Sequence, residues 1–165
     1  LVCFNTTAQQ NLPLYFNSSA TTSSVFSIGS AANTGVDMNV NGSNFVAYCW
    51  AEIAGFSKFG SYTGNGSTDG PFVYLGFRPK FIMVKRTDST GIWIMYDTSR
   101  STYNVMVNEL VANTANAEDA TSTNNTFDFV SNGFKLRQSG QDNISSATYI
   151  YAAFADNPFN VALAR

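Results

Sequence analysis

FVAYCWAEIAGF at residues 45–56 and YIYAAFADNPF at residues 149–159 are two forms of one strand pattern, and this pattern decides the predicted fold. Both copies are rich in aromatic and β-branched residues, as β-strands are, and both carry an acidic residue at the same point, Glu52 and Asp156. Each copy is apolar on both faces of a strand. We therefore expect each to lie centrally in a sheet that is covered on both sides.

The two copies belong to a longer internal repeat. VFSIGS at 25–30 corresponds to GFKLRQ at 133–138, and LV at 1–2 to LV at 110–111, so that matching positions lie 104 to 109 residues apart. We expect residues 1–56 to be the C-terminal half of one repeat unit and residues 57–165 a complete unit, packed together as one compact β domain. The half unit also predicts that the chain is a piece of a longer protein. Tandem units of this size are more typical of arrays and stalks than of enzymes.

The composition predicts a folded chain with an extracellular or virion type of surface. Hydrophobic residues make up 44% of the sequence and aromatic residues 15%, which is enough for a core, whereas charged residues at 12% are about half the usual share. The net charge of −2 gives no attraction for nucleic acid or for an anionic membrane. No Lys or Arg precedes Lys58, which suggests that this third of the chain packs against a neighbouring unit or subunit.

Several classes of chemistry are excluded or disfavoured. The chain has no histidine, so a Ser-His-Asp triad is impossible and the commonest zinc ligand is missing. The sequence therefore predicts that the protein is not an enzyme and has no cofactor. No apolar window reaches the ~18 residues of a membrane-spanning helix, so we expect no membrane insertion.

The two cysteines, Cys3 and Cys49, do not form a disulfide scaffold. Cys49 lies in a hydrophobic run where its repeat counterpart is Ala153, which favours a buried small hydrophobic residue. A Cys3–Cys49 disulfide remains an alternative, because the spacing neither requires nor forbids it.

Short strand patterns bounded by turn residues dominate the chain and predict an all-β fold, an antiparallel β-sandwich of jelly-roll-like type with at most one short helix. The expected strands are residues 25–30, 44–53, 71–77, 80–86, 91–97, 126–131, 133–138 and 148–155. Residues 80–97 and 126–138 are each expected to form a hairpin, the second turning at Asn132-Gly133, and Asn41-Gly42 is expected to turn in the same way. Residues 104–118 are the one candidate for a helix, with a loop as the alternative.

Three polar segments imitate ligand-binding motifs. Residues 37–42 begin like a calcium loop, but Tyr48 occupies the position where the motif needs a glutamate, so a hairpin turn is the favoured interpretation. Residues 142–146 are expected to form a turn at the equivalent place of the second unit. Residues 64–71 are glycine-rich but lack the lysine of a phosphate-binding loop, and we expect a long loop there.

Two further groups of residues are candidates for functional sites. Glycosidase carboxylates could come from Glu52, Asp69, Asp97, Glu109 or Asp128, but Glu52 and Asp156 are repeat counterparts, which favours a structural role. The basic residues of one hairpin region lie near three aromatic residues, an arrangement that can bind sugars or bases, although such aromatics are more often core; the residues are Arg78, Lys80, Lys85, Arg86 and Arg100 with Tyr74, Phe77 and Trp93. The sequence thus assigns no catalytic, cofactor-binding or metal-binding residue and leaves the binding residues open.

Three runs of the sequence carry a family resemblance: GFSKFGSYTGNGSTDGPFVYLGFRPKFIMVKRTD at 55–88, FVSNGFKLR at 129–137 and YIYAAFADNPF at 149–159. Together they resemble a repeat domain of phage structural proteins, common in tail-fibre-like and other large virion proteins of marine and cyanobacterial phages. The similarity covers essentially the whole chain. It implies a viral structural protein on the tail or capsid surface, with copies of itself, as a homotrimer or tandem array, and other virion proteins as partners.

The expected function is that of a tail-fibre or receptor-binding domain, which contacts a host surface glycan or protein through polar loops on a rigid β scaffold. The alternative is a capsid decoration or head-fibre protein with a purely structural role. A glycan-degrading tailspike is the third hypothesis.

Overall fold

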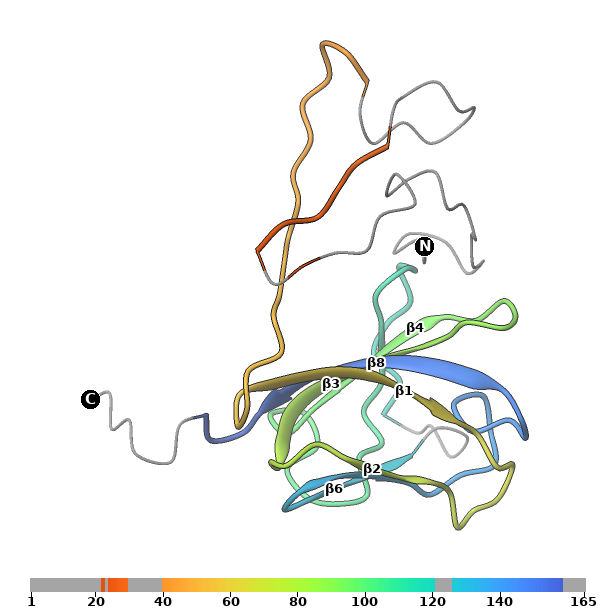
Figure 1. Ribbon diagram of the computed structural model, residues 1–165. Helices are drawn as coiled ribbons and strands as arrows, with labels where there is room; N and C mark the ends of the chain where they lie inside the picture. The colour runs from red at the N-terminus through yellow and green to blue at the C-terminus, as the bar shows by residue number, and fades with distance from the viewer. Residues whose placement is uncertain (1–21, 23, 30–39, 121–125, 159–165) are drawn as a thin grey trace. The chain divides into compact units, whose positions relative to one another are not determined.

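The computed structural model describes residues 22, 24–29, 40–120 and 126–158 (Figure 1). Contacts within the chain divide it into two compact units, and among the described residues the boundary falls between Ala51 and Glu52. All the strands lie in the second unit. They are β1 (Ser57–Thr63), β2 (Phe72–Tyr74), β3 (Pro79–Arg86), β4 (Trp93–Asp97), β5 (Leu110–Val111), β6 (Phe127–Val130), β7 (Gly133–Leu136) and β8 (Thr148–Ala155).

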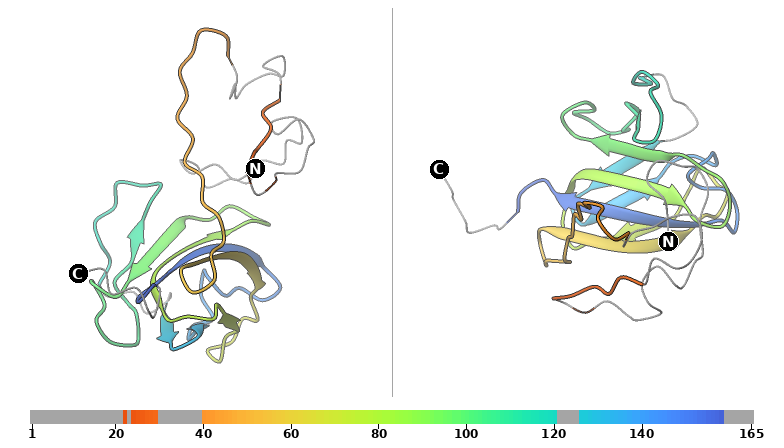
Figure 2. Two further views of the ribbon diagram at one scale, coloured as in Figure 1. Left: turned by 60° about the vertical axis from the view of Figure 1, so that its left-hand side comes forward. Right: turned by 90° about the horizontal axis from the view of Figure 1, so that it is seen from above.

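The strands form two antiparallel sheets that face each other, which confirms the predicted all-β, sandwich-like fold. The larger sheet has the order β1-β8-β3-β4-β5 and the smaller the order β2-β7-β6. Figure 1 shows the two sheets as separate layers, and the view from above in Figure 2 shows β1, β8, β3 and β4 side by side. The described residues contain no helix, so none of them forms a segment that could cross a membrane as a helix.

β8 holds the larger sheet together because it pairs along its length with β1 on one side and β3 on the other. Its residues alternate as the pleat of a strand requires: Tyr149, Tyr151, Ala153 and Ala155 are buried toward the core, and the residues between them are half-buried on the opposite face. The prediction of a central strand at 148–155 is therefore confirmed.

Aromatic rings fill the space between the sheets. Tyr62 of β1 stacks on Tyr149 of β8 with 4.9 Å between ring centroids, and Phe134 of β7 and Tyr151 of β8 form a T-shaped pair with 5.5 Å between centroids. Tyr96 and Phe127 join β4 to β6 at 4.9 Å. Such pairs add about 0.5–1.5 kcal/mol each beyond the area that they bury. The core thus joins β4 and β8 of the larger sheet to β6 and β7 of the smaller one.

Both predicted hairpins form. β3 pairs with β4, and β6 pairs with β7 across the two-residue loop Ser131-Asn132. Neither Asn132 nor Gly133 has a positive φ, so the type I′ turn expected at Asn132-Gly133 is wrong although the hairpin is right. Gly133 is instead required inside the strand, because a Cβ there would lie 2.1 Å from the Val73 carbonyl oxygen.

The loops at 64–71 and 142–146 form as expected and are joined by one buried amide. Asn143, 1% exposed, donates hydrogen bonds from Nδ2 to the carbonyl oxygens of Ser67 and Gln138 at 2.8 and 2.7 Å. Its Oδ1 accepts the Asn65 N–H at 2.8 Å. The glycine-rich segment is therefore a structural loop held to the second turn, which supports the interpretation that it is not a phosphate-binding loop.

Two expectations for secondary structure are wrong, and a third, for residues 104–118, is resolved between its two alternatives. Described residues 25–29 and 44–52 form no strand, although they carry the pattern, because they are not paired in a ladder with any strand of the described residues. Residues 104–118 form a loop, which was the alternative to a helix; this loop contains β5 and two isolated bridges, Met106–Phe127 and Glu109–Asp119.

The expectations for Cys49 and for the first polar segment have mixed outcomes. Cys49 is exposed rather than buried and is a free cysteine, since residues 44–52 have no sheet around them. Cys3 lies outside the described residues. The predicted turn at Asn41-Gly42 is confirmed: Ser43 donates its N–H to the Val40 carbonyl at 3.1 Å, and Gly42 has φ of 79°. Residues 37–39 of the calcium-loop imitation lie outside the described part.

Candidate functional site

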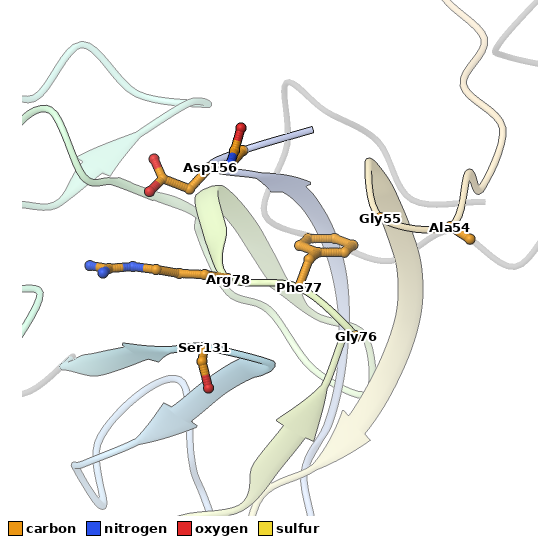
Figure 3. A pocket seen from close by; sticks show the side chains of 8 residues that line it. Ala54, Gly55, Gly76, Phe77, Arg78, Ser131 and Asp156 are labelled. Carbon is orange, nitrogen blue, oxygen red and sulfur yellow. The ribbon is translucent and has the colours of Figure 1, made fainter. Parts of the chain in front are cut away.

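A pocket of about 400 Å³ lies at one end of the sandwich, where several turns meet (Figure 3). Its walls come from the turn before β1, the segment between β2 and β3, the β6–β7 loop and the residues after β8. The lining residues are Ala54, Gly55, Gly76, Phe77, Arg78, Ser131, Asp156 and Asn157. The volume falls in the range of roughly 300–1,000 Å³ that is usual for ligand pockets.

Backbone hydrogen bonds fix the turns around this pocket. Phe56 and Ser57 both donate their N–H groups to the Ile53 carbonyl at 2.9 Å, which closes a tight turn through Gly55 at φ 74°. Leu75 and Gly76 donate to the Asn132 carbonyl at 2.9 and 3.1 Å, and Gly76 has φ of 83°. Both glycines occupy left-handed positions that other residues adopt at a cost. The pocket is thus built from fixed backbone.

The side chains of the pocket carry both signs of charge. Figure 3 shows the side chains of Arg78 and Asp156 extending to the same side, with the Phe77 ring on the other. The Asp156 carboxylate lies 3.6 Å from Lys80 Nζ, and the Asp156 N–H donates to the Arg78 carbonyl at 2.8 Å. Arg78 is exposed and forms no ion pair or hydrogen bond through its guanidinium with any other described residue. This pocket can therefore offer five unused donors to a ligand.

The predicted basic and aromatic group divides between core and surface. Phe77 and Trp93 are each 8% exposed, which confirms that these two belong to the core. Lys85 is buried and donates from Nζ to the Arg86 carbonyl at 2.7 Å, and burial lowers the pKa of its ammonium group. Tyr74 is exposed on β2, where Lys58 Nζ lies 5.5 Å from its ring centroid. The group does not form one platform.

The candidate carboxylates are engaged in structural contacts. Asp69 pairs with Lys135 at 2.7 Å, Asp97 with Arg100 at 2.9 Å, and Asp128 with Arg137. Glu109 is buried and accepts a hydrogen bond from the Tyr96 hydroxyl at 3.1 Å. Glu52 is exposed, and its repeat counterpart Asp156 lines the pocket. No cluster of His, Cys, Asp and Glu suited to a metal ion occurs in the described ranges.

A second group of ionisable side chains is buried beneath the loops. Asp142 is 5% exposed; burial first, and the nearby Glu109 second, raise the pKa of its carboxyl well above the usual value. Its Oδ2 has no hydrogen-bond partner among the described residues. The Tyr62 hydroxyl donates to the Asp142 carbonyl at 2.9 Å, and burial raises the pKa of that phenol too. Burial and the neighbouring Glu109 thus favour the protonated form of the Asp142 carboxyl over its charged form.

Residues 45–52 form a further exposed surface of a different kind. Phe45, Val46, Tyr48 and Trp50 are 53%, 79%, 77% and 65% exposed, and the Tyr48 and Trp50 rings stack with 6.3 Å between centroids. Large apolar side chains exposed together usually mark an interaction surface. Sequence reasoning identified this segment through the repeat but expected it to be buried.

The pocket itself was not predicted from the sequence. Its residues come from four turns up to about a hundred positions apart, and no spacing links Arg78 to Ser131 or Asp156. The one usable signal was the repeat, which singled out Asp156 as the counterpart of Glu52. The unpaired state of Arg78 depends on where the acidic side chains lie, and that is set by the fold.

Comparison with known proteins gives one match. The family model described as a domain of unknown function, DUF7483, matches residues 1–158. No curated protein and no solved structure matches the chain.

Proposed function

The chain belongs to the DUF7483 family, a domain of unknown function, and we propose that it is a phage virion structural protein that contacts the host surface. The observation that carries this proposal is the repeated strand pattern, present once as the paired strand β8 and once as the exposed residues 45–52. A chain that exposes a complete apolar strand pattern is suited to assembly with further subunits. The sequence resemblance to repeat domains of virion proteins supports the same role.

Assembly with copies of itself is the corresponding proposal for partners. Residues 45–52 expose several large apolar side chains, and a surface of this kind is suited to packing on another chain. We propose that this segment packs on a neighbouring subunit in a homotrimer or tandem array. Light scattering of the purified protein tests this: an oligomer is expected, and Trp50→Ser with Val46→Ser should shift it toward monomer. A wild-type monomer at all accessible concentrations would contradict the proposal.

Host contact is supported by the arrangement at the pocket end of the sandwich. Several turns present polar groups on a rigid β scaffold, and Arg78 is available there for a ligand. The decisive experiment locates the protein on the virion by gold-labelled antibody and asks whether the free protein competes with phage for host cells. Tail labelling with competition is expected. Labelling confined to the capsid without competition would favour the alternative, a decoration protein with a purely structural role.

The tailspike hypothesis is disfavoured by the contacts of the carboxylates. Asp69, Asp97 and Asp128 each pair with a basic side chain, and Glu109 is buried against a tyrosine. Retaining and inverting glycosidases need two carboxylates about 5–9 Å apart on one cleft. We expect no release of reducing sugar from host polysaccharide; measurable release would restore this hypothesis.

A further inference from the structure

We propose that the pocket at Arg78 binds a carboxylate-bearing saccharide, an inference that deepens the proposed host contact and rests on it for its biological role. The argument begins with Arg78, whose guanidinium makes no ion pair or hydrogen bond within the described part of the chain. Most other described cations have partners: Lys80, Arg86, Arg100, Lys135 and Arg137 pair with carboxylates. An arginine left unpaired in a pocket is the residue type that binds planar carboxylates through two parallel hydrogen bonds.

The charge balance of the pocket favours an anionic ligand. Asp156 is the acidic residue of the lining, and Lys80 at 3.6 Å offsets its charge. The positive charge of Arg78 therefore remains for the ligand. The Asp156 carboxylate still has lone pairs that can accept hydrogen bonds from hydroxyl groups.

The other lining groups fit the rest of a sugar. Ser131 offers a hydroxyl that donates and accepts, and Asn157 offers an amide with both functions. Ala54, Gly55 and the small exposed part of Phe77 also line the pocket and give it apolar surface for the C–H groups of a ring. A simple carboxylate would use Arg78 alone, whereas an acidic sugar would use the donors, the acceptors and the apolar wall together.

The pocket is preorganised for such a ligand. Its turns are closed by hydrogen bonds to the carbonyl oxygens of Ile53 and Asn132, and Asp156 is tied to Arg78 through the backbone. Binding therefore orders only the exposed side chains of the pocket and not its backbone, which lowers the entropic cost of association.

The test measures binding of glucuronic acid, glucose and acetate to the whole chain by saturation-transfer NMR and titration calorimetry. Glucuronate is expected to bind, and glucose and acetate to bind much more weakly. Arg78→Ala should weaken glucuronate binding about 10- to 100-fold, as expected for the loss of charged hydrogen bonds. Arg78→Lys should keep part of the affinity, because a point charge cannot form the two parallel bonds. Arg100→Ala removes an equal charge outside the pocket and should leave the affinity unchanged.

Three results would overturn the inference. Equal binding of glucose and glucuronate would show that the carboxylate does not contribute to binding. Acetate binding as tightly as glucuronate would show that the sugar ring does not contribute. If Arg78→Ala is folded, as judged by its thermal unfolding curve, and binds glucuronate with unchanged affinity, the ligand does not bind at this pocket. Competition with phage for host cells is measured separately. If the protein binds glucuronate through Arg78 but does not compete with phage, the proposed host contact is overturned and the saccharide site stands. If it competes with phage but does not bind glucuronate, the saccharide site is overturned and the proposed host contact stands.

Discussion

β8 and residues 45–52 carry one strand pattern in two environments. β8 is paired on both edges, and Tyr149 and Ala153 on its core face are 1% and 0% exposed. Their repeat counterparts Phe45 and Cys49 are both exposed, in a segment that belongs to no strand of the described residues. The difference shows that an apolar alternating pattern supplies the side chains for a sheet, whereas the flanking strands decide whether it becomes one.

The most direct test of this comparison is to replace the matching aromatic residue of each copy by alanine. Tyr149→Ala removes a ring that stacks on Tyr62 and a hydroxyl that donates to the Gln141 carbonyl at 2.7 Å. We expect it to lower the free energy of unfolding by about 3–5 kcal/mol. Phe45→Ala, at the matching position, should change it by less than about 0.5 kcal/mol. Urea denaturation of both variants measures this, and a large cost for Phe45→Ala would mean that residues 45–52 are packed in solution.

A second pair of repeat counterparts extends this comparison to the smaller sheet. Gly133 of β7 corresponds to Val25, and a Cβ at Gly133 would lie 2.1 Å from the Val73 carbonyl and 2.9 Å from the Phe72 ring. Gly133→Ala must therefore push β2 away from β7, at an expected cost of about 1–3 kcal/mol. Val25→Gly serves as the control and should be close to neutral, since Val25 is 62% exposed. A neutral Gly133→Ala in the same denaturation assay would show that β2 moves freely.

These two cases indicate what the sequence could predict. β3, β4 and β8 were found because aromatic and β-branched residues alternate between clear turn signals. β1 was missed, since SKFGSYT is polar and contains a glycine; the strand forms because β8 supplies a partner. Gly60 fits there because a Cβ would meet the Tyr151 hydroxyl at 2.7 Å. Such a requirement exists only once both strands are in place.

The candidate site was less predictable than the fold for the same physical reason. The strands follow from local pattern, but the pocket follows from turns that the pairing of distant strands brings together. Arg78 was noted in the sequence as one of several cations near aromatics. It is distinguished from them by the ion pairs of Lys80, Arg86 and Arg100 and by the burial of Lys85, and these depend on tertiary contacts.

The pH dependence of the free energy of unfolding provides a third test, which concerns Asp142 in the loop that precedes β8. The raised pKa of the buried Asp142 means that the folded protein retains a proton that the unfolded chain releases above about pH 4. Stability contributed by this group is therefore complete below that pH and is lost as the pH rises through the folded-state pKa. The slope can reach about 1.4 kcal/mol per pH unit. Asp142→Asn should flatten it in urea denaturation between pH 4 and 8.

Asp69 provides a control of opposite sign for this test. A hydrogen bond from Lys135 lowers the pKa of its carboxyl, so its contribution is present at neutral pH and is lost as the pH falls. Asp69→Asn should therefore leave the decline toward alkaline pH intact. If Asp142→Asn kept the wild-type slope, the buried carboxyl would not be the group that loses its proton.

The smallest effect on stability is expected at Cys49, where the readout is chemical reactivity. In a Cys3→Ser background, the exposed thiol of Cys49 should react with a thiol reagent as fast as in the unfolded chain. Ala153→Cys, with Cys49→Ser, places a thiol at the counterpart position of β8, which is 0% exposed, and should react only when the sheet opens. Residues 45–52 are either covered by a second subunit in solution or remain exposed, and the protein concentration distinguishes these cases. If a second subunit covers them, Cys49 becomes protected from the reagent as the oligomer forms. A reaction rate that is independent of concentration would leave the segment exposed and would remove the assembly role proposed for it.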